Sequence, residues 1–191
     1  AVYGGTFDPP TLAHEAIIEA ALDLPDIDQL WVMPSGDRLD KPGMSSREIR
    51  LSLLHLMMTA RFLDDPRLIV SEFEMNLPQP STTIETYRAL DATYPQDDFH
   101  FIFGADSYQD MPNWQEGAWL QNHLGMLLVA RSGYELPPES EQVRHLPFFE
   151  QQVISSTVVR ERVRAGLDIS TLVNPLIAGR VYEIAAAEAV Q

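Results

Sequence analysis

Short apolar runs alternate with longer amphipathic segments along the whole chain, and this alternation limits the fold more than any other feature of the sequence. Short, continuous apolar runs are typical of buried strands, whereas apolar residues at every third or fourth position are typical of helices. Strands that alternate with helices usually pair in parallel, because each helix carries the chain back to the edge of the sheet where strands start. The pattern therefore predicts an α/β fold with a parallel sheet.

The elements can be placed by their residue numbers. The expected strands are 1–3, 30–33, 68–70, 99–103 and 126–130, and the expected helices are 14–22, 46–62, 83–94, 114–122, 156–165 and 175–190. The stretches 35–46 and 133–147 contain glycines and prolines and are expected to be long loops. Because no linker separates two cores, we expect one domain over residues 1–191, an open doubly wound parallel sheet with helices on both faces. The abrupt first run also leads us to expect a few native strand residues before Ala1.

The charge balance restricts the partners that this chain can bind. Lysine and arginine number 13 against 28 aspartates and glutamates, which gives a formal net charge of -15. Such a field repels polyanions, so we expect binding neither to nucleic acid nor to anionic membranes. The chain has no cysteine, which excludes thiolate catalysis and cysteine-ligated metal centres. No apolar run approaches the roughly 20 residues of a spanning helix and no leader pattern opens the chain, so the expected location is cytoplasmic.

Four common catalytic signatures are missing from the sequence. It contains no G-x-G-x-x-G turn, no G-x-x-x-x-G-K-[ST] loop, no H-E-x-x-H pair and no G-x-S-x-G elbow. The histidines also lack the i, i+4 spacing that places two metal ligands on one helix face. We therefore expect no protein-bound metal site.

The first strand leads into a turn that suits an anion. Gly4 and Gly5 allow the backbone to approach a ligand closely, and the helix that follows presents unpaired N–H groups at its start. Thr11 and His14 are three residues apart, so the hydroxyl and the imidazole can face the same ligand as these amides. From the spacing alone, an N-terminal cap at Thr11 and a surface histidine at His14 are an equally good interpretation.

A second helix start near the other end of the chain has the same character. Ser155 and Ser156 are good capping residues, and Arg160 follows Ser156 by about one helical turn on the same face. Taken alone, the segment is a capped helix with a solvated arginine. The basic residues Arg38, Lys41, Arg47 and Arg50 fit either a clamp on a triphosphate or an ion-paired helix start.

Both helix starts resemble the motifs of the nucleotidylyltransferases. The run G-G-T-F-D-P-P-T-L-A-H resembles the family's G-G-[ST]-F-D-P-x-[HT]-x-G-H signature, with Ala13 where the family usually has glycine. The run I-S-S-T-V-V-R at 154–160 is similar to the family's I-S-S-T-x-x-[RK] motif. The resemblance implies a Rossmann-like nucleotidylyltransferase fold in which Thr11 and His14 contact the nucleotide phosphates.

Three more segments resemble the nicotinate or nicotinamide mononucleotide adenylyltransferases within that family: 81–86, 103–107 and the tryptophan Trp114. The resemblance implies that Thr83 lies near the carboxylate or amide of the pyridine, that Trp114 stacks on the ring, and that Gly104 and Asp106 hold the ribose of ATP. Each residue has a structural alternative, since Trp114 can anchor the core and Asp106 can cap a helix. Phosphopantetheine adenylyltransferase and a non-catalytic nucleotide-binding regulatory module remain the alternative functions.

These considerations give one set of predicted site residues. The predicted catalytic residues are Thr11, His14 and Arg160. The predicted ATP-binding residues are Gly4, Gly5, Thr6, Phe7, Lys41, Gly104, Asp106, Ile154, Ser155, Ser156 and Thr157. The predicted mononucleotide-binding residues are Arg47, Thr83, Trp114 and Arg131. Mg²⁺ is expected to arrive with ATP. The expected partners are ATP and a pyridine mononucleotide, and the sequence leaves undecided whether the chain forms a homo-oligomer.

Overall fold

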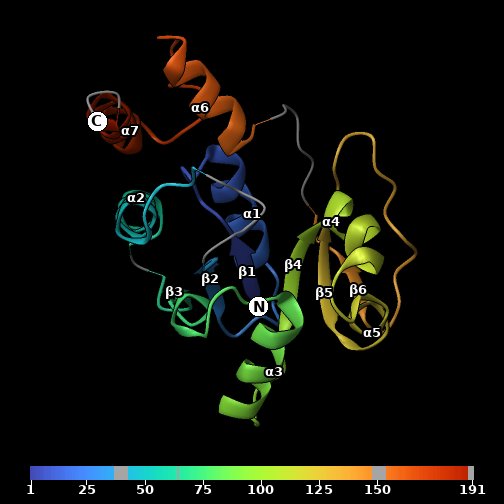
Figure 1. Ribbon diagram of the computed structural model, residues 1–191. Coiled ribbons are helices and arrows are strands. Elements are labelled where there is room, and N and C mark those ends of the chain that lie inside the picture. The colour runs from blue at the N-terminus through green and yellow to red at the C-terminus, as the bar shows by residue number, and fades with distance from the viewer. Residues whose placement is uncertain (37–42, 64, 148–153, 189–191) are drawn as a thin grey trace.

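A twisted parallel sheet forms the centre of the molecule. The computed structural model describes residues 1–36, 43–63, 65–147 and 154–188. In these residues six strands lie in the order β3-β2-β1-β4-β5-β6, and every neighbouring pair is parallel (Figure 1). Their bounds are β1 Val2–Gly5, β2 Leu30–Pro34, β3 Leu68–Val70, β4 His100–Gly104, β5 Gly125–Val129 and β6 Val143–His145. The predicted doubly wound α/β architecture is confirmed.

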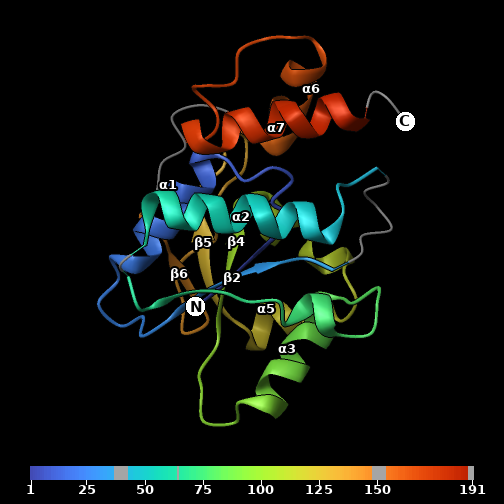
Figure 2. The same ribbon diagram turned by 90° about the vertical axis from the view of Figure 1, so that its left-hand side faces the viewer.

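Helices cover both faces of this sheet. The α-helices are α1 Leu12–Leu22, α2 Arg47–Arg61, α3 Thr83–Thr93, α4 Ala105–Asp110, α5 Gly117–His123, α6 Ser156–Arg164 and α7 Pro175–Glu188. Two short 3-10 helices are η1 Glu74–Asn76 and η2 Met111–Asn113. Figure 2 shows α2 lying across the sheet, with α7 running beside it. No helix in the described residues combines the length and the apolar character that crossing a bilayer requires.

Alternate residues of the strands pack into two separate hydrophobic cores, one on each face of the sheet. Tyr3 of β1 and Ile102 of β4 pack with α1, α2 and α7, whereas their neighbours Val2 and Phe101 pack with α3 and α5 on the other face. All four side chains are buried. Successive side chains of a strand point to opposite faces, so a sheet covered on both sides needs continuous apolar strands. This requirement explains why the strands were recognisable in the sequence as unbroken apolar runs.

The order of the strands reverses between β1 and β4. The chain runs outward from β1 through β2 to β3 and then crosses to the other side of β1, where β4 begins the second half. The two strands are paired at Val2 and Phe101. In open α/β sheets a ligand crevice forms at the carboxyl ends of the strands where the order reverses. The segments that follow Gly5 and Gly104 therefore meet at the expected place for a site.

One predicted helix is wrong. Residues 114–122 do not form a single helix: η2 ends at Asn113, Trp114 is extended, and α5 begins only at Gly117. Glu116 precedes α5 with φ of 52°, in the left-handed region. A Cβ at Gly117 would collide with the carbonyl oxygen of Met111, so this turn requires glycine. The tight turn interrupts an apolar spacing that otherwise fits a helix.

Besides the two 3-10 helices, one strand and one α-helix were not predicted. The expected loop 133–147 contains β6, an edge strand with only Val143 buried, whose Arg144 forms an ion pair with Asp26. Helix α4 follows β4 directly, and its six residues are mostly polar. Both elements are too short to show a period in the sequence. Of the other expected loop, residues 37–42 lie outside the described part of the chain.

Candidate active site

A large cavity of about 1670 Å³ opens at the carboxyl ends of β1 and β4. It is lined by the turn after β1, the starts of α3 and α6, and the segment that follows β4. The predicted site residues that line it are Gly4, Gly5, Thr6, Phe7, His14, Thr83, Gly104, Asp106, Trp114, Arg131, Ile154, Ser155, Ser156, Thr157 and Arg160. The fold thus gathers in one cavity residues that are spread over most of the sequence.

The turn between β1 and α1 is folded tightly around aromatic rings. Phe7 has a φ of 51°, which is unusual for a residue other than glycine. Its ring lies 5.0 Å from the ring of His14 and 5.5 Å from that of Tyr3, centroid to centroid. A Cβ at Gly5 would lie 3.0 Å from the Phe7 ring, so a side chain there would displace it. The glycine therefore allows Phe7 to pack directly beside His14.

Thr11 and His14 bond to each other at the start of α1. Nδ1 of His14 lies 2.9 Å from the backbone nitrogen of Thr11 and 2.8 Å from its hydroxyl oxygen. Thr11 is fully buried and is not among the described residues that line the cavity, whereas the partly exposed His14 is. The sequence predicted that the two side chains face one ligand together. The structure instead turns the Thr11 hydroxyl toward the imidazole.

The start of α6 is joined to the turn after β1. Ser155 caps the helix by accepting a 3.3 Å hydrogen bond from the N–H of Val158. Ser156 donates a 2.8 Å hydrogen bond to the carbonyl of Pro9, and Arg160 donates to the carbonyl of Asp8. These contacts connect residues about 150 positions apart. The starts of α1 and α6, far apart in the sequence, therefore converge in space.

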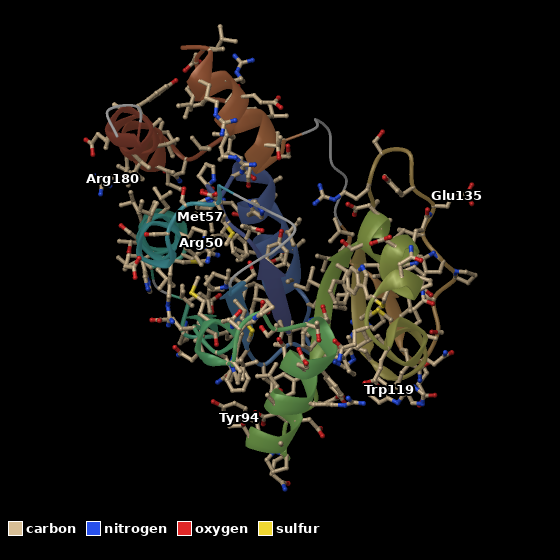
Figure 3. The ribbon with its side chains drawn as sticks, in the orientation of Figure 1. Arg50, Met57, Tyr94, Trp119, Glu135 and Arg180 are labelled. Carbon is tan, nitrogen blue, oxygen red and sulfur yellow. The ribbon has the colours of Figure 1, made fainter. Side chains whose placement is uncertain are left out.

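A buried arginine holds the loops beneath the cavity. Arg50 of α2 is only 1% exposed and lies on the sheet side of its helix (Figure 3). Its guanidinium donates hydrogen bonds to the carbonyls of Ser35 at 2.7 Å and of Thr6 and Ser45 at 3.2 Å each. Asp8 adds a second link, because its carboxylate accepts a 3.0 Å bond from the N–H of Ser45. The ends of β1 and β2 are thus fixed relative to the start of α2.

The segments that follow β4 and β5 bring an acid and a base to the opposite side of the cavity, Asp106 after β4 and Arg131 after β5. Nε of Arg131 lies 3.9 Å from a carboxylate oxygen of Asp106, and both side chains line the cavity. A Cβ at Gly104 would collide with that carboxylate and lie 3.0 Å from Nε of Arg131. Glycine is therefore required at this position if the two charged groups are to approach each other.

Trp114 is held by a carboxylate one helical turn earlier in the chain. Its indole Nε1 donates a 2.9 Å hydrogen bond to Asp110, and Asn113 donates a 3.0 Å bond to the other oxygen of that carboxylate. These two bonds lower the pKa of Asp110, because they stabilise the ionised form. The ring of Phe103 meets the indole edge to face at 5.8 Å. Trp114 thus presents an oriented ring at the cavity wall.

The start of α3 contributes hydroxyl groups. The backbone N–H and the hydroxyl of Thr82 each donate a 2.8 Å bond to Glu85, which lowers the pKa of that carboxyl group. Thr83 lines the cavity beside this cap, and Thr86 lines it one turn further on. Thr86 is 1% exposed, and its hydroxyl has no hydrogen-bond partner among the described residues. A buried hydroxyl without a partner is costly, so Thr86 is suited to receive a ligand atom.

Arg47, like Thr11, is a predicted site residue that does not line the cavity. Arg47 bonds to Glu72 and Asn76, each at 2.7 Å, and to the carbonyl of Met75. It is absent from the described residues that line the cavity, so its predicted contact with a mononucleotide has no support from the geometry. Lys41 lies outside the described residues. Within the described residues no group of three or more His, Asp or Glu side chains is placed to hold a metal ion.

Four residues of the site were missed at the sequence level: Asp8, Arg50, Thr86 and Asp110. Thr86 and Asp110 carried a usable signal, because Thr86 ends the segment 81–86 and Asp110 precedes Trp114 by one helical turn. Arg50 was noticed only as part of a basic cluster. No local pattern distinguishes an arginine that bonds to buried carbonyls from one that is solvated.

Known proteins resemble this chain over most of its length. A cytidylyltransferase-like family model matches residues 2–162. A relative from Thermus thermophilus, named probable nicotinate-nucleotide adenylyltransferase, is 33% identical over 169 residues, which cover 88% of each chain. A relative of the same name from Bacteroides fragilis is 30% identical over 189 residues, covering 95% of this chain and 90% of that one.

Solved structures share the fold at lower identity. The nicotinic acid mononucleotide adenylyltransferase of Plasmodium falciparum complexed with NaAD superimposes with a TM-score of 0.79 and 20% identity, over 96% of this chain and 94% of that one. Its complex with APC gives a TM-score of 0.77 at 19% identity, with the same coverage. At these sequence identities the structural similarity shows that the folds are the same.

Proposed function

The chain belongs to the cytidylyltransferase-like family of nucleotidyltransferases, and on that premise we propose that it transfers the adenylyl group of ATP to nicotinate mononucleotide. The products are the dinucleotide and pyrophosphate, which makes the reaction a step of NAD biosynthesis. One observation carries the proposal: the bond from Ser156 to Pro9 joins the start of α6 to the turn that leads into α1, and both helix starts line one cavity at the reversal of the strand order. Relatives that are at least 30% identical over most of the chain carry the corresponding name.

The proposed chemistry needs no general base. The second pKa of a phosphate monoester is about 6, so the mononucleotide phosphate is already ionised near neutral pH and can attack the α-phosphorus of ATP directly. The protein then has to align the two reactants and stabilise the charge that develops on the α-phosphate oxygens. Mg²⁺, which we expect to arrive on the ATP phosphates, supplies charge neutralisation when bound. This division of work is consistent with a cavity whose described residues provide hydrogen-bond donors but no catalytic dyad.

We propose that the phosphates lie between the two helix starts. There His14, Arg160 and the start of α6 offer donors to an anion, whereas at the start of α1 the N–H of Leu12 already bonds to the carbonyl of Leu172. Gly104 and Asp106 lie at the end of β4 on the same cavity, where the adenosine ribose is proposed to bind. Thr83, Thr86 and Trp114 line the remaining part of the cavity, where the pyridine ring is proposed to bind. The start of a helix favours a negative charge, so we propose nicotinate rather than nicotinamide as the preferred ring.

A substrate panel tests this function. The purified protein is incubated with ATP, Mg²⁺ and, separately, nicotinate mononucleotide, nicotinamide mononucleotide and phosphopantetheine, and pyrophosphate release is measured. We expect the fastest turnover with nicotinate mononucleotide, and the His14→Ala variant serves as the control for a contaminating enzyme. Preferred turnover of phosphopantetheine would contradict the proposal. ATP binding without pyrophosphate from any acceptor would instead indicate a non-catalytic nucleotide-binding module.

The other expectations about partners remain proposals of the same kind. The net charge of -15 supports the absence of nucleic-acid and anionic membrane partners, and we propose a cytoplasmic location for the enzyme. Sedimentation at several protein concentrations measures whether the chain forms a homo-oligomer. Filter binding with duplex DNA and flotation with anionic vesicles check the two excluded partners.

A further inference from the structure

The bonds between Thr11 and His14 determine which ring nitrogen carries the proton. The backbone N–H of Thr11 can only donate, and it lies 2.9 Å from Nδ1 of His14. Nδ1 must therefore offer its lone pair, and a neutral imidazole with an unprotonated Nδ1 carries its proton on Nε2. The hydroxyl of Thr11, 2.8 Å from the same atom, adds a second donor that favours the same tautomer.

The surroundings of the ring fix its orientation as well. The ring of Phe7 lies 5.0 Å away and that of Tyr3 lies 6.1 Å away, so aromatic neighbours restrict rotation. Nδ1 is turned toward the buried Thr11, while His14 itself lines the cavity. The Nε2–H is consequently the donor that the ring offers to a ligand there.

We propose that Thr11 is a positioning residue that holds His14 as a neutral imidazole with its proton on Nε2. This inference rests on the proposed function and specifies how His14 takes part in it. The Nε2–H donates a hydrogen bond to a phosphate oxygen of ATP, and no proton is transferred. An imidazolium would carry a second proton on Nδ1, which would face the N–H of Thr11 and break that bond, while the Thr11 hydroxyl would have to change from donor to acceptor. His14 is therefore a fixed hydrogen-bond donor and not an acid that changes its charge during the reaction.

The tautomer can be measured without any turnover. In protein labelled with ¹⁵N, long-range proton–nitrogen spectra distinguish the protonated from the unprotonated ring nitrogen of each histidine. The signals of His14 are identified by their loss in the His14→Ala variant. We expect an unprotonated Nδ1 and a protonated Nε2 at neutral pH. A proton on Nδ1 of His14, in either the neutral or the doubly protonated ring, would overturn the proposal.

A double-mutant cycle tests whether Thr11 acts through His14. Thr11→Val removes the hydroxyl but keeps the side-chain volume, and we expect kcat to fall about 10-fold with a smaller change in the KM for ATP. In the His14→Ala background the same change should alter kcat by less than about 2-fold, because the group that Thr11 orients is already gone. Thr11→Ser keeps the hydroxyl and should stay close to the wild type. Equal effects of Thr11→Val in the two backgrounds would mean that Thr11 acts independently of the His14 imidazole, for example through its cap on α1, against the proposal.

The two measurements separate this inference from the proposed function. If the protein forms no pyrophosphate with any mononucleotide, the proposed function fails, while the tautomer of His14 is still measured by NMR. If the protein is active but Nδ1 is protonated, the function stands and the positioning by Thr11 fails. Should Thr11→Val not fold, the spectrum of the wild type decides the question.

Discussion

The two walls of the cavity are built in different ways. The phosphate wall, residues 4–14 and 154–160, has its polar groups bonded to one another: Thr11 to His14 at the start of α1, and Ser156 to Pro9 and Arg160 to Asp8 across elements. The ring wall, residues 83–86 and 110–114, contains the hydroxyl of Thr86, which has no partner among the described residues. Cross-linked donors stay in place when a ligand binds, whereas an unpaired donor gains a partner only from the right ligand. The comparison indicates that the first wall aligns the reactive phosphates and the second selects the acceptor.

Removing His14 should have the largest effect and should be confined to turnover. Loss of one preorganised donor typically lowers turnover 100- to 1000-fold, so we expect about this loss for His14→Ala, with part of the ATP affinity retained. Pyrophosphate release and ATP titration calorimetry measure the two quantities. His55→Ala, an exposed histidine on α2, is the matched control and should behave as the wild type. Near-normal turnover of His14→Ala would show that the phosphate wall does not align the reaction.

Removing the Arg160 side chain should have the second largest effect on activity. Its guanidinium lines the cavity and also ties α6 to the carbonyl of Asp8, so Arg160→Ala removes a charge and a cross-link together. A hydrogen bond to a charged group contributes about 1.5–3 kcal/mol, and we expect kcat/KM to fall about 10- to 100-fold. Arg162→Ala is the control, since Arg162 is on the same helix but bonds to the carbonyl of Asp168. Equal activity of the two variants would contradict a role of Arg160 at the phosphates.

Trp114 tests the ring wall. We expect Trp114→Ala to raise the KM for the mononucleotide about 10-fold and to leave the KM for ATP nearly unchanged, because the indole is proposed to stack only on the pyridine. Trp114→Phe keeps an aromatic face but loses the bond to Asp110, so its KM should lie in between. Steady-state kinetics with each substrate varied in turn measure both constants. If both KM values rise together, the division of the cavity into two walls is wrong.

The two walls also differ in how far the sequence revealed them. The phosphate wall is encoded by contiguous residues, because a capped helix start is a local structure, and the cap was placed correctly at Ser155. Gly4 and Gly5, expected in the turn, are instead the last two residues of β1. Most of the sheet was equally readable, since buried parallel strands are unbroken apolar runs. The ring wall depends on the turn between η2 and α5, which is set by the close approach of Gly117 to Met111 and has no local signal. The burial of Arg50 and the unpaired hydroxyl of Thr86 likewise arise from tertiary contacts.

The substitution Thr86→Val should make the folded protein more stable and weaken its binding of the mononucleotide. Valine has nearly the shape of threonine and removes a buried hydroxyl without a partner, so we expect the free energy of unfolding to rise by about 1 kcal/mol. If a ligand atom satisfies this hydroxyl in the complex, the KM for the mononucleotide should rise about 5-fold. Chemical denaturation and steady-state kinetics measure the two effects, and Thr86→Ser, which keeps the hydroxyl, should keep the KM. A stabilised variant with an unchanged KM would show that Thr86 lines the ring wall without contacting the acceptor.

Replacing Asp110 should have the smallest effect on the KM for the mononucleotide near neutral pH, and its effect should be measurable only at acid pH. Hydrogen bonds from Asn113 and Trp114 lower its pKa in the folded protein, so the stabilisation that they provide is fully present above the pKa of the unfolded chain and is lost as the pH falls through the lower folded value. Between neutral pH and the usual carboxyl range we therefore expect the indole to keep its orientation and the KM for the mononucleotide to stay constant. Below that range the fluorescence difference between the wild type and Trp114→Phe should change, while Asp110→Asn, which cannot ionise, should show no such transition. An identical acid transition in Asp110→Asn would mean that another group orients Trp114, and the ring wall would then not depend on this carboxylate.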